Sequence, residues 1–213
     1  MTAQDALEAS YLAVIDALED VDDGLASAPT RCAGWVVQDL VHHLLSDAQR
    51  ALVALHTPAA SGVDTDAVSY WLAFRPDPTR VDPALNHTRV MAGEWSFRSL
   101  VSAYAETAHA AITASNERAG AEVVTTQGRV LTVDSLRSTL AVEATVHLLD
   151  LRLGEPSAQG LAEVRRVLDG LLGQPAAISD DARYALLGTG RDRPNANEEA
   201  ILGDRAGRLP LFG

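Results

Sequence analysis

One short stretch of the chain, VEATVHLLDL at residues 142–151, carries three ionisable side chains in an otherwise almost wholly apolar helical pattern. They are Glu143, His147 and Asp150, and at about 3.6 residues per turn they fall within about 60° of one another. An ionised carboxylate that is buried without a partner costs several kcal/mol, so these groups must be paired. A carboxylate and an imidazole four residues apart can chelate a divalent metal ion from one helix face. The pattern therefore predicts a metal site that takes a further ligand from another helix.

The helix predicted over residues 36–56 offers two neighbouring candidates for that ligand, His42 and His43. His42 lies on a side of the helix that is otherwise polar, which predicts contact with solvent. His43 shares its side with apolar residues and with Asp47 and Arg50, and such a mixed stripe can face inward. Periodicity therefore favours His43.

The predicted metal ligands are His43, Glu143 and His147. Two imidazoles and one carboxylate leave a coordination position open, which is typical of a catalytic rather than a structural site. Zinc is the first choice of metal, and nickel, iron or manganese suit the same ligands. Two alternatives stay open. A fourth protein ligand would indicate a non-catalytic metal module, and Glu143 and His147 could simply satisfy each other in a metal-free bundle.

Three further side chains have candidate roles. Asp150 can accept a hydrogen bond from a metal-bound imidazole, and the alternative is a salt bridge with an arginine. Arg50 lies two turns from His43 on the same face, where it can meet an anionic substrate or cofactor; the alternative is an ion pair with Asp47. We predict Asp150 and Arg50 as catalytic positions, and Arg50 also as a cofactor-binding position. Cys32, at a helix entry, is interpreted as a small buried residue; the alternative, a reactive thiol, would need a cationic neighbour, and only Arg31 is evident.

The composition excludes several classes of function. The 213 residues carry 17 basic and 29 acidic side chains, a net charge of -12, so nucleic acid and anionic membranes are poor partners. All 17 basic residues are arginine, which excludes a Walker A lysine, a Schiff-base lysine and a lysine general base. The single cysteine excludes an internal disulfide and a cysteine cluster for zinc. With no run of about 18 apolar residues and no signal-peptide pattern, we predict a cytoplasmic protein.

Apolar spacing and capping residues predict four long helices. They cover residues 4–21, 36–56, 97–120 and 134–154. Residues 57–96 are broken by proline and glycine and predict a long crossover, with short helices at most near residues 68–74 and 83–91. β-Branched residues around a Gln-Gly pair predict a small hairpin over residues 121–132.

The fold class predicted from these elements is all-α. It is a four-helix bundle with a long crossover between helices two and three, a small β-hairpin before helix four, and extra C-terminal helices. Residues 1–155 form the bundle, and residues 156–213 form a helical extension packed on it. Leucines of the extension, such as Leu168 and Leu172, can cover the bundle or form a dimer surface, so both a monomer and a homodimer stay open.

Two stretches also match the motifs of a known family. CAGWVVQDLVHHL, residues 32–44, resembles the C-x-G-W-x-x-x-D-L-x-x-H-L signature of the mycothiol-dependent maleylpyruvate isomerase N-terminal family. VEATVHLLDL resembles the E-x-x-x-H-x-x-D-L segment of the same family. The resemblance covers about the first 155 residues and implies a DinB-like metal-binding four-helix bundle. It also implies a divalent metal, usually zinc, on His43, Glu143 and His147.

The resemblance implies a reaction class as well. Members of this family use a low-molecular-weight thiol, mycothiol in actinobacteria, whose sulfur binds the metal and becomes a nucleophilic thiolate. For this chain it implies a transferase or isomerase with mycothiol as cosubstrate and a small electrophile as substrate. In that scheme Arg50 orients an anionic group and Asp150 positions the metal-bound histidine. The alternative, from a different class, is a non-catalytic metal-binding bundle that binds a ligand or a partner.

Overall fold

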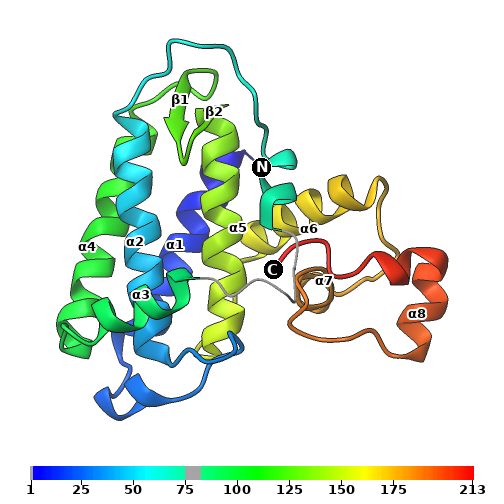
Figure 1. Cartoon of the computed structure of the whole chain (residues 1–213), viewed down its shortest axis with the longest axis horizontal. Coiled ribbons are helices and arrows are strands. Elements are labelled where there is room, and N and C mark those ends of the chain that lie inside the picture. Colours follow the sequence, from blue (N-terminus) through cyan, green and yellow to red (C-terminus); the bar gives the residue numbers. More distant parts are fainter. Residues whose placement is uncertain (1, 75–82) are drawn as a thin grey trace.

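Four long helices form the body of the protein in a computed structural model that describes residues 2–74 and 83–213. They are α1 (Ala3–Glu19), α2 (Val37–Leu55), α4 (Phe97–Asn116) and α5 (Val133–Leu151). Figure 1 shows these helices side by side, with a two-stranded hairpin at one end and the C-terminal helices on the side of α5. The prediction of an all-α bundle with a hairpin and extra C-terminal helices is confirmed.

The helices begin where the sequence supplies a capping side chain. At α1, Thr2 Oγ1 accepts a hydrogen bond from the Asp5 backbone at 3.1 Å, and the Asp5 carboxylate accepts one from the Thr2 backbone at 2.8 Å. At α5, Thr132 Oγ1 accepts a hydrogen bond from the Ser135 backbone at 3.1 Å. This helix ends earlier than predicted, because Arg152 takes a left-handed conformation with φ of 60°. A short 3-10 helix, η1 (Asp23–Ser27), precedes α2.

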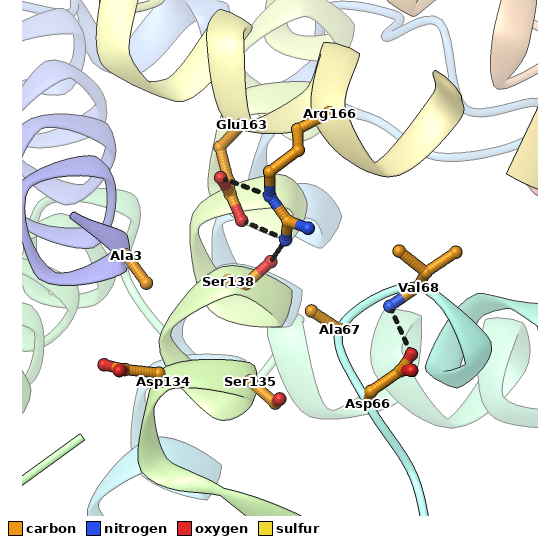
Figure 2. Close-up of a pocket in the computed structure, with 9 residues that line it drawn as sticks. All are labelled: Ala3, Asp66, Ala67, Val68, Asp134, Ser135, Ser138, Glu163 and Arg166. Carbon is orange, nitrogen blue, oxygen red and sulfur yellow. Dashed lines mark hydrogen bonds and ion pairs between the residues drawn. The ribbon is translucent and has the colours of Figure 1, made fainter. Parts of the chain in front are cut away.

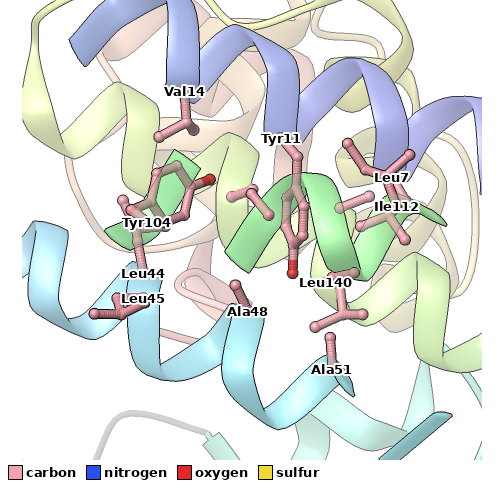
Figure 3. Close-up of a cluster of buried hydrophobic side chains, with 14 of the residues drawn as sticks. Leu7, Tyr11, Val14, Leu44, Leu45, Ala48, Ala51, Tyr104, Ile112 and Leu140 are labelled. Carbon is pink, nitrogen blue, oxygen red and sulfur yellow. The ribbon is translucent and has the colours of Figure 1, made fainter. Parts of the chain in front are cut away.

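The core of the bundle joins all four long helices, as Figure 3 shows. Its labelled members are Leu7, Tyr11, Val14, Leu44, Leu45, Ala48, Ala51, Tyr104, Ile112 and Leu140. The rings of Tyr11 and Tyr104 meet edge to face with their centroids 6.4 Å apart. Both rings are almost completely buried, so this aromatic contact sets the spacing between α1 and α4.

Helix α5 is buried on nearly every side because it lies between two cores. Leu140 belongs to the core of the bundle, whereas Val142 and Val146 belong to a second core that includes Leu168 of the C-terminal region. A helix that is covered on both sides leaves little of its surface to solvent. Its buried polar side chains, such as Thr145, His147 and Asp150, therefore have partners inside the protein.

The connection between α2 and α4 runs along the hairpin. It contains the 3-10 helix η2 (Ser69–Phe74) and the helix α3 (Pro83–Ala92), while residues 75–82 of the predicted crossover lie outside the described residues. In the hairpin, β1 (Val123–Thr126) pairs antiparallel with β2 (Arg129–Thr132). The turn is formed by Gln127 and Gly128, with φ of 49° and 73°, so the predicted Gln-Gly turn is confirmed.

The C-terminal region forms four more elements, of which the first two contact α5. They are α6 (Ala158–Leu172), α7 (Asp181–Gly188), α8 (Ala196–Leu202) and the 3-10 helix η3 (Gly203–Arg208). Helix α6 contacts α1 and α5, and α7 contacts α5 and α6. Leu168 and Leu172 are buried in the second core. The boundary near residue 155 between two units stays a prediction. Within the two described ranges, no helix is long and apolar enough to cross a membrane.

Polar contacts also fasten α6 to α5, as Figure 2 shows. Glu163 accepts hydrogen bonds of 3.0 Å and 2.7 Å from Arg166 on the next turn of α6. Arg166 Nη2 also donates to Ser138 Oγ of α5 at 3.0 Å. These three residues line a surface groove of about 390 Å³. Their polar atoms at this edge of the α5–α6 interface are hydrogen-bonded to one another.

We expect the substitution Gly160→Val to weaken the docking of α6. A side chain at Gly160 would collide with the hydroxyl oxygens of Ser10 and Thr145, which are buried and hydrogen-bonded to each other at 2.9 Å. Overpacking of this kind costs about 1–3 kcal/mol, which urea unfolding would measure. The matched control is Gln159→Val, at the exposed neighbouring position of the same helix turn. An equal loss of stability in both variants would contradict the close approach of α6 to α1 and α5 at Gly160.

Candidate metal centre

Helices α2 and α5 bring three of the predicted side chains together. His43 comes from α2, Glu143 and His147 come from α5, and one ligand atom of each lies within 4.8 Å of the others. His147 Nε2 is 3.3 Å from Glu143 Oε2. The rings of His43 and His147 meet edge to face with centroids 4.8 Å apart. The structure therefore assembles the predicted set, while metal binding by it stays a prediction.

Asp150 fixes the orientation of His147. Its carboxylate is completely buried, and Oδ2 accepts a hydrogen bond from His147 Nδ1 at 3.0 Å. Since Nδ1 is used in this way, Nε2 is the nitrogen that faces Glu143. An acceptor placed like this sets the tautomer and the ring orientation of a metal-binding histidine. From the sequence, this contact and an ion pair with an arginine were alternatives, and Asp150 makes both.

The arginine that pairs with Asp150 is Arg191, in the segment after α7. Its Nη2 donates to Asp150 Oδ2 at 3.1 Å and its Nε donates to Oδ1 at 3.2 Å. Its Nη1 donates to the carbonyl oxygen of Thr189 at 2.9 Å. The C-terminal region thus neutralises a buried charge of the bundle. Sequence reasoning did not find Arg191, because it lies in a glycine- and arginine-rich tail without a periodicity that would orient it.

Burial and neighbouring charges set the protonation of the three side chains. Burial, together with the charge of His147, lowers the pKa of His43 from 6.5 to about 4, so its ring is neutral at pH 7. Burial acts to raise the pKa of Glu143, but the hydrogen bond and charge of His147 outweigh it and bring the pKa to about 2. Burial acts to lower the pKa of His147, but hydrogen bonds to Asp150, Cys32 and Glu143 raise it well above 6.5. A cation bound at Nε2 would replace the proton of His147.

Cys32 contacts the same buried carboxylate. Its Sγ donates to Asp150 Oδ2 at 3.2 Å and lies 4.0 Å from His147 Nδ1. Cys32 is half-buried rather than fully buried: it packs against the edge of the bundle core and also lines a cavity. Cys32, His147 and Asp150 also have ligand atoms within 4.8 Å of one another. His147 therefore belongs to two candidate donor sets. Its Nε2 faces Glu143 in the first set, and its Nδ1 faces Cys32 and Asp150 in the second.

The first donor set, together with Cys32 of the second, lines a cavity of about 500 Å³. Beside Cys32, His43, Glu143 and His147, its walls include Arg31, Trp35, Trp71, Phe74, Arg191 and Phe212. Trp71 and Phe212 stack with centroids 4.3 Å apart, and Phe74 lies 5.9 Å from Trp71. An apolar wall beside a few polar groups is the usual form of a small-molecule site. Sequence reasoning did not find this wall, because its rings come from η2 and from the end of the chain.

Arg50 does not reach this cavity. Its Nε donates to Asp47 Oδ1 at 3.0 Å, and the two side chains are only 14% and 8% exposed. This is the ion pair that the sequence allowed as the alternative. Arg50 is not among the residues that line the cavity, so a contact with an anion there would require the ion pair to break. Its charge does contribute to the low pKa of Glu143. Its roles in catalysis and cofactor binding stay predictions.

The chain has detectable relatives. Residues 7–152 match the family described as the mycothiol maleylpyruvate isomerase N-terminal domain. The crystal structure of a mycothiol-dependent maleylpyruvate isomerase matches at 15% identity and a TM-score of 0.55, covering 78% of this chain and 68% of that one. The structure of a histidine-to-alanine mutant of such an isomerase matches at 14% identity and a TM-score of 0.62, covering 89% and 88%. These likenesses confirm the predicted fold. The comparison with curated proteins found no match.

We expect Arg191→Met to destabilise the protein. The substitution leaves the completely buried carboxylate of Asp150 without its cation, and removal of one partner of a buried pair costs about 3–5 kcal/mol. Urea unfolding would measure this loss. The double variant Arg191→Met/Asp150→Asn should recover part of it, because a neutral amide needs no cation. A loss below about 1 kcal/mol in the single variant, as for a surface ion pair, would contradict this assignment.

Proposed function

Because this chain belongs to the family of the mycothiol maleylpyruvate isomerase N-terminal domain, we propose that it is a metal-dependent enzyme that uses a low-molecular-weight thiol. The thiol is mycothiol or a close chemical relative. The reaction is transfer of its sulfur to a small electrophile, or thiol-assisted isomerisation of one. The observation that carries the proposal is the convergence of His43, Glu143 and His147 on the wall of a cavity that can hold a small molecule.

The chemistry of these three donors suits a divalent metal. Two imidazoles and a carboxylate are the ligand types of catalytic zinc sites, and the same set also binds iron, nickel or manganese. One imidazole already has its Nδ1 held by Asp150, which leaves Nε2 as its ligand atom. All three donors line the cavity, so the free coordination position would open into it. A divalent metal bound here would lower the pKa of a thiol and so supply a thiolate at neutral pH.

The second donor set, Cys32 with His147 and Asp150, is the poorer metal site. Asp150 is already paired with the Arg191 guanidinium through three hydrogen bonds of 3.1 to 3.3 Å. A metal ion on that carboxylate would lie close to a like charge. It would also take Nδ1 of His147 away from the hydrogen bond that orients the ring. We therefore assign Asp150 to positioning His147 and not to holding the metal.

Residues that contact the donors fix the ring orientation of His147 and favour the ionised form of Glu143. Asp150 holds the ring of His147 so that Nε2 faces Glu143. Arg50, paired with Asp47, contributes a positive charge that favours the ionised form of Glu143. In this proposal Arg50 is a positioning residue, in contrast to the direct contact with an anion that the sequence predicted.

The aromatic wall binds the carbon skeleton of the reactants. Trp71 and Phe212 present stacked rings to the cavity, and Phe74 continues this surface. Such rings exclude water from the reacting sulfur, which favours attack on the electrophile over loss of the thiolate by protonation. A purely structural metal site would need a fourth protein ligand. The sulfur of Cys32 lies toward Nδ1 of His147 rather than toward Nε2, which favours the enzyme over that alternative.

We expect His43→Ala to remove the metal. Wild-type protein, purified without a histidine tag from metal-supplemented cultures, should contain about one equivalent of metal by elemental analysis, and the variant should contain little. The matched control is His42→Ala, which removes the neighbouring imidazole outside the donor set and should leave the metal content unchanged. Metal-free wild-type protein, or equal metal content in the His43→Ala variant, would show that the assigned ligands are wrong.

We also expect a thiol to bind the metal directly. In protein loaded with cobalt(II), mycothiol or N-acetylcysteine should produce a thiolate-to-cobalt charge-transfer absorption, because the metal favours the thiolate form. N-acetylserine, which has oxygen in place of sulfur, is the matched control ligand and should leave this region of the spectrum unchanged. A cobalt-loaded protein that does not respond to either thiol would rule out the thiol-dependent reaction and leave the metal site intact.

A further inference from the structure

We propose that Arg31 binds a carboxylate group of the molecule that occupies the cavity. This inference rests on the proposed function, because it assigns to the same site the residue that would hold a negatively charged end of the electrophile. The reacting end of that molecule would lie at the donor set of His43, Glu143 and His147, and its carboxylate at Arg31. All four residues line the same cavity.

Arg31 is held in position by the last turn of α5. Its backbone nitrogen donates to the carbonyl oxygen of Asp150 at 3.0 Å, and its Nε donates to the carbonyl oxygen of Leu149 at 3.1 Å. Helix α5 ends at Leu151, so these carbonyls belong to its negative end, where a cation is favoured. The guanidinium is therefore partly ordered before any ligand arrives, which reduces the entropy lost on binding.

Two nitrogens of the Arg31 guanidinium remain free for a ligand. In the part of the chain that the structure describes, Nη1 and Nη2 have no hydrogen-bond acceptor, and no carboxylate oxygen lies within 4.0 Å of them. The side chain is half-buried and lines the cavity. Two parallel N–H groups of a guanidinium match the two oxygens of a carboxylate, so a bidentate ion pair can form.

The neighbouring arginines already have partners. Arg191 lines the same cavity, but its guanidinium donates to the carboxylate of Asp150 and to a backbone carbonyl. Arg50 donates to Asp47 through Nε and Nη2. Its buried Nη1 has no partner among the described residues, but the residue lies outside the cavity wall. In this proposal Arg31, which lines the cavity, meets the anion that the sequence assigned to Arg50.

The chemistry of Arg31 suits a carboxylate. One guanidinium balances the charge of one carboxylate, and its two terminal nitrogens can donate to the two oxygens. The cavity also contains the stacked rings of Trp71 and Phe212, which suit a carbon skeleton between the two ends. A hydrogen bond to a charged group contributes about 1.5–3 kcal/mol, which corresponds to a preference of about tenfold or more for an acid over its amide.

The experiment compares mercapto acids with their amides on the zinc-loaded protein. Mercaptopropionic acid and mercaptopropionamide, together with longer homologous pairs, carry the same thiol for the metal and differ in the charge at the far end. Calorimetric titration would give both affinities for each pair. For the pair whose length spans the cavity, the wild type is expected to bind the acid about tenfold more tightly. In Arg31→Gln this ratio is expected to fall to about one, and in Arg31→Lys to an intermediate value.

The matched control is Arg98→Gln. It removes the same charge from a side chain near the start of α4 that is 74% exposed and is not part of the cavity wall, so the ratio should stay at the wild-type value. A ratio that survives in Arg31→Gln, or that falls equally in Arg98→Gln, overturns the inference and leaves the proposed function standing. If neither thiol of any pair binds the zinc-loaded wild type, the proposed function fails instead. Metal content and thermal unfolding of each variant verify that it is folded and loaded.

Discussion

The site depends on the hydrogen bonds that neutralise the buried carboxylate of Asp150. This carboxylate has no exposed surface, yet it accepts hydrogen bonds from three separate parts of the chain. His147 belongs to the same helix, Cys32 to the loop before α2, and Arg191 to the segment after α7. A carboxylate without solvent is stable only when its charge is balanced and its lone pairs are used. The three contacts therefore join a helix, a loop and the C-terminal region at one point, and His147 takes its orientation from that point.

Helix α5 makes this arrangement possible because it is covered on both sides. One side packs in the bundle core with Leu140, and the other packs on α6 through Val142 and Val146. A polar stripe on such a helix cannot be solvated, so it is either paired or functional. In this stripe Asp150 is paired with Arg191, whereas Glu143 and His147 present donor atoms to the cavity. The motif-bearing helices thus supply the donors, and the C-terminal region supplies the balancing cation and part of the wall.

In this chain without lysine, the arginines around the centre have different roles. Arg191 balances Asp150, and Arg50 balances Asp47 behind the donors. Both are mostly buried, and the planar guanidinium suits such sites because it stays charged and forms several hydrogen bonds in fixed directions. Arg31 differs, since it is anchored through Nε to the carbonyl oxygen of Leu149 and, among the described residues, neither of its terminal nitrogens has a hydrogen-bond acceptor. These two free nitrogens, together with its place in the cavity wall, are the reason that we propose Arg31 for ligand binding.

The features that the sequence determined by itself are those that depend on neighbours a few residues apart. Helical periodicity and capping residues gave the long helices, the Gln-Gly pair gave the hairpin, and the polar stripe of α5 singled out Glu143 and His147. The choice of His43 over His42 rests on the same periodicity. Only the tertiary structure paired Asp150 with Arg191, because these residues are 41 positions apart and the tail between the short helices has no repeating pattern. It likewise decided that Arg50 turns to Asp47 and that Cys32 faces the cavity, since two rotamers of one side chain can serve different roles and only the surrounding packing selects between them.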